Sequence, residues 1–188
     1  MKIIGITGTL GAGKGTIVDF LVRNKGFRHY SVRDFLLDEV HKRALPENRD
    51  SLTLVANELR KSHTPSYIVD ELYATAKENG RDAIIESIRT PGEVKSLRHK
   101  GGFILLAIDA KPEIRYERIK VRKSITDQID FDTFLANEKR EMSSDDPNKQ
   151  NLGKCIEMAD FVIDNNGDLN TLFTILEVLW NTISEKNE

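Results

Sequence analysis

Short apolar runs alternate along the chain with longer stretches in which apolar residues recur every three or four positions. The short runs predict buried strands at residues 2–6, 27–31, 82–88, 102–109 and 160–164. The periodic stretches predict helices at residues 14–24, 32–43, 51–61, 66–79, 91–100, 111–123, 131–142 and 168–183. Because such alternation is typical of a parallel sheet with helices on both faces, we expect a three-layer α/β/α fold with about five strands.

The length and the charge balance narrow the class of protein. We expect a single domain over residues 1–188, with inserted lobes but no linker and no internal repeat. Lys and Arg number 28 against 30 Asp and Glu, so the overall charge of −2 favours neither a nucleic-acid nor a membrane-surface partner. No apolar run approaches the roughly 20 residues of a membrane span, and the N-terminus lacks the form of a signal peptide, which favours a cytoplasmic protein. The single cysteine, Cys155, is expected to be a semi-buried thiol.

The bend between the first strand and the first helix carries the clearest chemical signal. It reads Gly8-x-x-x-x-Gly13-Lys14, which is typical of a loop that wraps a polyphosphate. Glycines let backbone N–H groups approach phosphate oxygens, the helix N-terminus adds partial positive charge, and the lysine reaches the terminal phosphates. A dinucleotide site is not favoured, because Thr16 follows the glycines and the second strand ends at Ser31 rather than at an acid.

The stretch "GTLGAGKGT" at residues 8–16 resembles the glycine loop of the P-loop nucleoside monophosphate kinase superfamily, which includes adenylate kinases, dephospho-coenzyme A kinases and phage-type deoxynucleoside monophosphate kinases. The resemblance implies ATP and Mg²⁺ as cofactors. The loop residues expected to bind the donor are Thr9, Leu10, Gly11, Ala12, Gly13, Lys14, Gly15 and Thr16. Since Gly15 stands where a serine or threonine usually follows the lysine, Thr16 is expected to reach the metal through water.

The resemblance also implies a helical acceptor-binding lobe at about residues 31–80. Ser31 and Asp34, just after the second strand, match positions that line the acceptor pocket of adenylate kinases. The arginine that this family carries a few residues later falls at Leu37. Arg33 is a candidate replacement by chemistry alone, and an exposed residue in the first helical turn is the alternative interpretation.

A second charged pair ends an otherwise apolar strand in "AIIESIR", at Glu86 and Arg89. Charges in such a place are costly without a partner. The resemblance implies that Glu86 contacts metal-bound water or an acceptor hydroxyl, and that Arg89 binds the acceptor phosphate with its planar guanidinium. A structural ion pair between the two residues is the alternative.

Three arginines share one face of the helix at 111–123: Arg115, Arg118 and Arg122. Like charges at this spacing repel, so a nearby phosphate would explain them, and a solvated basic face is the alternative. The resemblance implies that Arg118 packs beside the donor base and that Arg122 reaches the transferring phosphate, which leaves Arg115 as an expected surface residue.

The segment at about residues 123–142 corresponds to a short lid, which would exclude water on closing. It contains no cysteine, so a zinc-bearing lid is excluded. Within it, Lys139 and Arg140 could add positive charge, although "EKRE" at 138–141 is more typical of a solvated face whose charges pair with one another.

The last strand runs into "NNGD" at residues 165–168. The resemblance implies that Asn166 and Gly167 contact the adenine of the donor, while an ordinary turn is the alternative. A GTPase is not favoured, because the lysine of the guanine-recognition pattern is missing. In the final helix, Phe173 and Trp180 are expected to pack in the core, with a dimer contact as the alternative.

Together these features favour an enzyme that transfers the γ-phosphoryl group of Mg·ATP to a small phosphorylated or hydroxyl acceptor, with Lys14, Arg89 and Arg122 as catalytic residues. A nucleoside or deoxynucleoside monophosphate is the expected acceptor. Two alternatives stay open: a dephospho-coenzyme A kinase-like activity, and a slow ATP-hydrolysing regulatory switch that has no small-molecule acceptor. The sequence does not separate a monomer from a homodimer.

Overall fold

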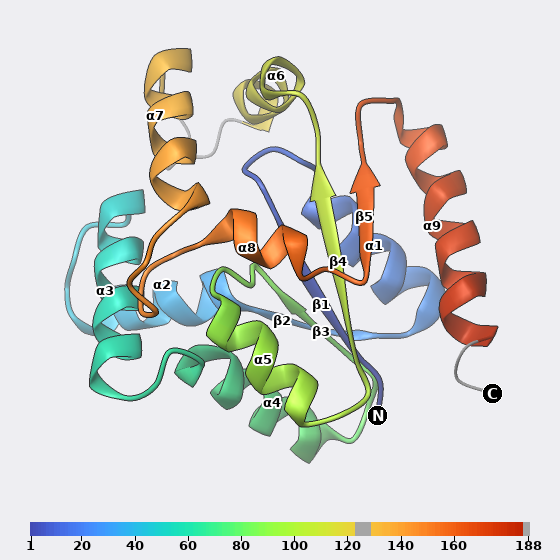
Figure 1. The fold of residues 1–188 in the computed structure, drawn as a ribbon, viewed down its shortest axis with the longest axis horizontal. Helices are drawn as coiled ribbons and strands as arrows, with labels where there is room; N and C mark the ends of the chain where they lie inside the picture. Colours follow the sequence, from blue (N-terminus) through green and yellow to red (C-terminus); the bar gives the residue numbers. More distant parts are fainter. Residues whose placement is uncertain (123–128, 186–188) are drawn as a thin grey trace.

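The computed structural model describes residues 1–122 and 129–185, and it contains one five-stranded parallel sheet (Figure 1). The strands are β1 (Ile3–Gly8), β2 (Arg28–Ser31), β3 (Ala83–Glu86), β4 (Phe103–Asp109) and β5 (Phe161–Asp164). They lie in the order β2-β3-β1-β4-β5, and every neighbouring pair is parallel. The predicted α/β fold with a five-stranded parallel sheet is therefore confirmed.

Helices cover both faces of the sheet. In the described residues they are α1 (Lys14–Lys25), α2 (Val32–Lys42), α3 (Arg49–Ser62), α4 (Tyr67–Asn79), α5 (Pro91–His99), α6 (Pro112–Arg122), α7 (Phe131–Met142), α8 (Leu152–Glu157) and α9 (Leu169–Glu185). One apolar cluster joins α1 and α9 to the sheet through Ile4, Ile17 and Leu172, while a second joins α4 and α5 through Ile85 and Val94. The two clusters make the outer layers of a three-layer fold.

The strand order creates a crevice at the centre of the sheet. The connection from β1 passes through α1 to β2, whereas the connection from β3 passes through α5 to β4 on the other side of β1. Neighbouring strands β1 and β3 therefore send their chains to opposite faces of the sheet. Ligands of open α/β sheets bind at such a point, beyond the carboxyl ends of the strands.

Helix α8 is the element that the sequence pattern did not predict. It has six residues, too few to show a helical period, and the side chain of Asn151 accepts a hydrogen bond from the backbone N of Lys154 at its start. Cys155 points from α8 into the core and is fully buried, and this burial raises the pKa of its thiol to about 12. It is thus more deeply buried than expected, and it stays protonated.

The two aromatic residues of α9 differ in their surroundings. The Trp180 ring meets Phe27 edge-on, with 5.5 Å between ring centroids, as a core residue would. Phe173 lies 6.4 Å from Phe20, yet 41% of it is exposed. Core packing thus describes Trp180 and only part of Phe173.

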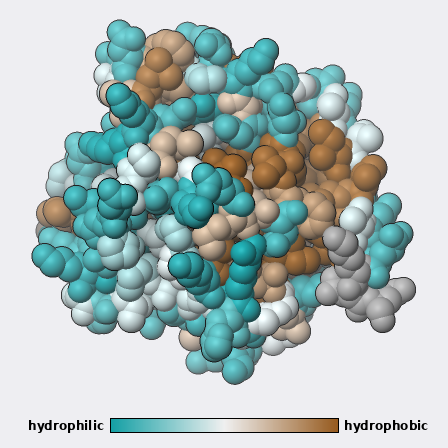
Figure 2. Space-filling view, viewed as in Figure 1, coloured by the Kyte–Doolittle hydropathy of each residue, from teal (hydrophilic) through white to brown (hydrophobic). Residues whose placement is uncertain are grey.

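Part of the sheet is left uncovered on the face that Figure 2 shows, where apolar side chains gather over β4, β5 and α9. Val162 of β5 is 61% exposed and Val178 of α9 is 63% exposed. A contiguous exposed apolar surface is a common place for a partner to bind, and a second copy of the chain is one such partner. The oligomeric state, monomer or homodimer, stays a prediction. None of the described helices is both long and apolar enough to cross a membrane.

A buried ion pair ties α3 to α5. Arg60 donates from Nε and Nη2 to Oε1 of Glu93, over 3.1 and 2.8 Å, and both side chains are almost completely buried. The second carboxylate oxygen of Glu93 accepts from the backbone N of Arg89 and of Thr90 at the start of α5. One carboxylate therefore fixes α3, α5 and the chain that follows β3.

Replacing the Glu93 carboxylate should destabilise the folded protein. We expect Glu93→Ala to lower the free energy of unfolding by about 3–5 kcal/mol, because it leaves the charge of Arg60 buried without compensation. Urea unfolding followed by circular dichroism measures this change. In the control, Glu157→Ala removes an exposed pair with Lys154 and should cost no more than about 1 kcal/mol. Equal losses for the two variants would contradict the role of Glu93.

Candidate active site

The bend after β1 is built from backbone that leaves no space for side chains. Gly8, Gly11 and Gly13 have φ angles of 141°, 78° and 112°. A Cβ atom on Gly8 would lie 2.0 Å from the carbonyl oxygen of Ile108, and one on Gly11 would lie 2.5 Å from that of Arg115. Only glycine fits such contacts, so the loop presents bare backbone to whatever it binds.

The first turn of α1 lies directly behind this loop and carries the lysine. Gly13 caps the helix without a side-chain hydrogen bond, and the first turn contains no acidic residue. An N-terminus of this kind, with amide groups that no side chain caps, attracts anions. Lys14 Nζ donates to the carbonyl oxygens of Gly8 and Thr9 over 2.9 and 2.8 Å, so the loop's own backbone holds the ammonium group.

The electrostatic surroundings of Lys14 prepare it for an anion. Burial and the nearby positive charge of Arg89 lower its pKa from 10.5 to about 8, although the carboxylates of Glu86 and Glu141 act in the opposite direction. A lysine in this state gains stabilisation when a negatively charged group arrives beside it.

One cleft of about 1390 Å³ opens beside the loop and takes in residues from both sides of the crevice. The loop residues that line it are Leu10, Gly11, Gly13, Lys14, Gly15 and Thr16. Thr9 and Ala12 are buried behind them: Thr9 donates to Asp109, and the carbonyl oxygen of Ala12 accepts from Asn165 over 2.7 Å. Of the eight loop residues expected to bind the donor, these two support the loop from behind.

All five residues expected on the acceptor side line the same cleft: Ser31, Arg33, Asp34, Glu86 and Arg89. The Ser31 side chain caps α2 by accepting a hydrogen bond from the backbone N of Asp34 over 3.1 Å. Arg33, in the first turn of α2, is exposed as well as part of the cleft wall. The start of α2 therefore forms one wall of the cleft.

Glu86 at the end of β3 is an ionised carboxylate. Burial alone would raise its pKa, but the His29 ring 3.7 Å away, the charge of Lys14 and the hydroxyl of Ser87 outweigh burial and lower the pKa to about 2. The next residue, Ser87, has a φ of 73°, a strained conformation for a residue with a side chain. At neutral pH Glu86 accepts hydrogen bonds and does not take up a proton.

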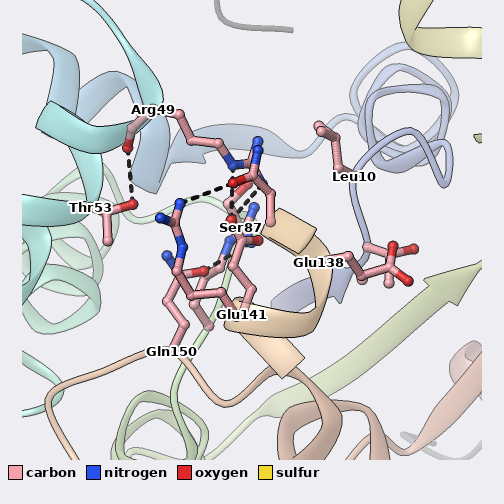
Figure 3. Close-up of polar contacts among 12 residues, drawn as sticks. Leu10, Arg49, Thr53, Ser87, Glu138, Glu141 and Gln150 are labelled. Carbon is pink, nitrogen blue, oxygen red and sulfur yellow. Dashed lines mark hydrogen bonds and ion pairs between the residues drawn. The ribbon is translucent and has the colours of Figure 1, made fainter. Parts of the chain in front are cut away.

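Arg89 binds a carboxylate that the sequence pattern did not identify, that of Glu141, which Figure 3 labels. Its Nη1 donates to Oε2 of Glu141 over 2.6 Å and to Gln150 over 3.1 Å, and Arg49 binds the other oxygen of Glu141. The expectation of a solvated, self-paired "EKRE" face is therefore wrong for Glu141, which is 5% exposed. The alternative of an ion pair between Glu86 and Arg89 is also wrong, since each binds other residues.

The expectation that Arg115 lies at the surface is also wrong, because Arg115 is 2% exposed. Its guanidinium binds the carboxylate of Glu138 in α7. It also donates to the carbonyl oxygen of Ala110 over 2.6 Å and to that of Leu10 over 3.3 Å. The residue thus supports the glycine loop from behind. The sequence shows only that the three arginines share a face, not which one turns towards the protein.

The other two arginines of α6, Arg118 and Arg122, line the cleft. Arg118 donates to the carbonyl oxygen of Gly167 over 3.3 Å, while its buried Nη1 has no hydrogen-bond partner in the described part of the chain. Gly167 lines the cleft, but Asn166 does not: its side chain accepts from the backbone N of Lys111 over 2.7 Å. Its neighbour Asn165, which the sequence analysis did not single out, lies in the cleft wall instead.

The described residues contain no group of three or more His, Cys, Asp or Glu side chains that could hold a metal ion. A divalent ion in this cleft would therefore take most of its ligands from phosphate oxygens and water, as Mg²⁺ commonly does beside nucleotides. Thr16 and Glu86 both line the cleft and fit that arrangement. Residues 123–128 of the expected lid lie outside the described residues, and its remainder is largely α7.

Comparison with known proteins agrees with this geometry. A family model described as an AAA domain matches residues 4–146. A UPF0200 protein from Methanococcus maripaludis strain C7 is 31% identical over 180 residues, which is 94% of each chain. The chain belongs to the AAA domain and UPF0200 families. A second UPF0200 protein, from Pyrococcus horikoshii, is 29% identical and covers 89% of this chain and 90% of its own.

Solved kinase structures share the fold of this UPF0200 protein. Shikimate kinase from Bacteroides thetaiotaomicron superposes with a TM-score of 0.64 at 11% identity, and covers 97% of this chain and 98% of its own. A sugar kinase from Janibacter sp. has a TM-score of 0.52 at 17% identity, with 97% and 95% covered. At these identities the likeness shows the fold alone. It confirms a P-loop kinase-like fold.

The glycine loop can be tested by two matched substitutions in this UPF0200 protein. We expect Gly8→Ala to lower the free energy of unfolding by about 3 kcal/mol or more, because its Cβ would overlap the Ile108 carbonyl. Nothing lies within 4 Å of a Cβ on Gly15, in the first turn of α1. Gly15→Ala should leave stability unchanged or raise it by up to about 1 kcal/mol. Thermal and urea unfolding measure both, and similar stability of the two variants would refute this packing.

Proposed function

We propose that the chain is an ATP-dependent phosphotransferase that moves the γ-phosphoryl group of Mg·ATP to a small phosphorylated acceptor, most directly a nucleoside or deoxynucleoside monophosphate. One observation carries the proposal. The glycine loop with Lys14 and, across from it, Arg49 and Arg89 line the same cleft at the centre of the sheet. One site would thus bind two anionic groups and leave space for transfer between them.

The donor end of this site would be the glycine loop and α6. The amide groups at the start of α1 would bind the β- and γ-phosphates. The Lys14 ammonium group would move from the carbonyl oxygens of Gly8 and Thr9 to these phosphates and neutralise part of their charge. Arg118 and Gly167 would flank the donor base, and Arg122 would contact the transferring group. Bound Mg²⁺ would neutralise charge on the phosphates, with Thr16 and Glu86 contacting its water ligands.

The acceptor end would be α2, α3 and the chain after β3. Arg89 would bind the acceptor's phosphate, Arg33 would add charge, and Ser31 and Asp34 would contact the rest of the molecule. The proposal includes a helical acceptor-binding lobe at about residues 31–80 and a lid at about residues 123–142. It also includes a cytoplasmic location, no nucleic-acid or membrane partner, and either a monomer or a homodimer.

The state of Glu86 favours a phosphate over a hydroxyl as the attacking group. A hydroxyl acceptor benefits from a side chain that takes up its proton, and a carboxylate with a pKa of about 2 is a poor base at neutral pH. A phosphate monoester is already anionic and attacks without giving up a proton. The chain's own residues then need only position donor and acceptor and neutralise charge.

Two alternative functions stay open, and a specific observation favours each of them. The turn after β5 resembles that of dephospho-coenzyme A kinases, which phosphorylate a hydroxyl. The engagement of Arg89 by Glu141 would suit a switch that hydrolyses ATP slowly and takes no acceptor.

An acceptor panel separates these functions. We expect radiolabelled ATP to transfer its γ-phosphoryl group to at least one nucleoside or deoxynucleoside monophosphate much faster than to water. Thin-layer chromatography of the products measures transfer and hydrolysis together. Dephospho-coenzyme A as the sole acceptor would support that activity instead, and hydrolysis that no acceptor changes would support the switch.

Arg89→Ala tests the acceptor site in the same assay, with Arg98→Ala as its control. It should lower kcat/KM for the acceptor by a factor that corresponds to about 2–5 kcal/mol, because it removes a desolvated phosphate ligand. Arg98→Ala, which removes an arginine paired with Asp160 outside the cleft, should retain activity. Equal activity of the two variants would remove Arg89 from the acceptor site.

The pKa of Lys14 predicts how nucleotide binding depends on pH. The protonated lysine binds the triphosphate, so binding raises its pKa above 8. Below pH 8 the group is already charged, and its contribution to affinity is constant. Above pH 8 each binding event takes up a proton, and affinity should fall by up to about tenfold per pH unit.

Calorimetry of ATP binding in two buffers with different ionisation enthalpies measures this proton uptake. In Lys14→Arg the guanidinium stays charged, so binding should be weaker but free of proton uptake between pH 8 and 9. Equal proton uptake by both proteins would assign the linkage to another group.

A further inference from the structure

The carboxylate of Glu141 is bound by two arginines from different parts of the chain. Arg49, the first residue of α3, donates from Nε and Nη2 to Oε1 over 2.9 and 2.5 Å. Arg89, after β3, donates from Nη1 to Oε2 over 2.6 Å. Each oxygen of the carboxylate therefore has its own guanidinium, and Figure 3 shows Arg49 and Gln150 converging on Glu141. Two guanidinium groups on one small anion make a strong and directional binding site.

This arginine pair, Arg49 and Arg89, belongs to the cleft rather than to the interior. Both arginines and Glu141 line the cleft, with 19%, 18% and 7% of their side chains exposed. A ligand that enters the acceptor end of the cleft therefore reaches the same donors that Glu141 now occupies.

A third arginine near the pair has a donor without an acceptor. Arg60, about three turns further along α3 than Arg49, binds the same Glu93 carboxylate as the backbone N of Arg89; it also lines the cleft and is 2% exposed. Its Nε and Nη2 bind Glu93, but its Nη1 has no hydrogen-bond partner in the described residues. A buried guanidinium donor without a partner is costly, and an anionic ligand beside it would remove that cost.

We propose that Glu141 occupies the place of the acceptor's anionic group, so that a phosphate monoester binds Arg49 and Arg89 by displacing the Glu141 side chain. The identification of this anion as the acceptor's phosphate rests on the proposed function. The two cannot share the arginines, because a phosphate dianion beside the ionised and mostly buried Glu141 carboxylate meets strong repulsion. Arg49 becomes a binding residue for the acceptor, and Glu141 determines which anions enter.

Displacement of Glu141 would move the end of α7. One turn earlier on the same helix, Glu138 binds Arg115, and Arg115 donates to the carbonyl oxygen of Leu10 in the glycine loop. Helix α7 thus binds Arg49 and Arg89 through Glu141. Through Glu138 it binds Arg115, which supports the glycine loop. Arrival of the acceptor would be communicated to the donor site through this helix.

Binding of inorganic phosphate tests the proposal without any transfer reaction. Calorimetry should show that Glu141→Gln binds phosphate about tenfold or more tightly than the wild type, because the competing charge is gone. Adding Arg49→Lys, which keeps the charge but loses the planar fork, should remove most of that gain. Phosphate bound only at the glycine loop would be insensitive to Arg49.

The matched control is Asp132→Asn, on the same helix. It removes one carboxylate from an exposed position that does not line the cleft, so its phosphate affinity should equal that of the wild type. If Glu141→Gln binds phosphate no better than the wild type, Glu141 is only a structural anchor and the proposal is overturned.

A measurement on a protein that keeps Glu141 covers the case in which Glu141→Gln does not fold. Spin labels on Leu54→Cys in α3 and Lys139→Cys in α7 occupy exposed positions, and the buried Cys155 does not react. Phosphate should add a second population to the distance distribution between α3 and α7. An unchanged distribution at every phosphate concentration would overturn the proposal.

These results are independent of catalysis. Tighter phosphate binding in Glu141→Gln together with no transfer to any acceptor would preserve the anion site and reject the kinase. Transfer in the acceptor panel together with unchanged phosphate binding would preserve the kinase and reject the displacement of Glu141.

Discussion

The close approach of Gly8 to the carbonyl oxygen of Ile108 is the contact on which the cleft depends. It brings the end of β1 against the end of β4, so that the chain must turn at once into α1. The same bend then packs Gly11 against α6 and Gly13 against Asn165 of the turn after β5. Three segments that are distant in sequence therefore meet at a loop whose glycines leave no room for side chains of their own. A rigid, bare backbone of this kind can surround phosphate oxygens without reorganising.

The end of β3 is fixed to β1 just as closely. The backbone N atoms of Ser87 and Ile88 both donate to the carbonyl oxygen of Ile6, over 3.0 and 3.1 Å. This double contact holds Ser87 in its left-handed conformation and sets Glu86 and Arg89 beside the glycine loop. Strain of this sort persists where the surroundings determine the backbone, which is commonly at a binding site.

Local signals in the sequence were enough to predict the strands, most helices and the glycine loop. Helical and strand periods, and glycines at fixed offsets, are properties of neighbouring residues. The partners of Arg115 and Arg89 are not local, since Glu138 and Glu141 lie 23 and 52 positions away from them. The "EKRE" stretch therefore resembled a solvated face, although the tertiary structure turns both of its carboxylates towards distant arginines. Helix α8 escaped prediction because six residues are too few to show a period.

The long-range ion pairs compensate the positive charge of arginines in the cleft and behind the glycine loop. Arg49 and Arg89 carry like charges that repel one another, and their side chains are mostly buried, so each needs an anion nearby. Glu141 supplies that anion for Arg49 and Arg89, and Glu138 supplies it for Arg115 behind the loop. Buried pairs of this kind add little net stability, but they fix orientation strongly. Exchange of the Glu141 carboxylate for an external phosphate would then keep both arginines neutralised while the ligand binds.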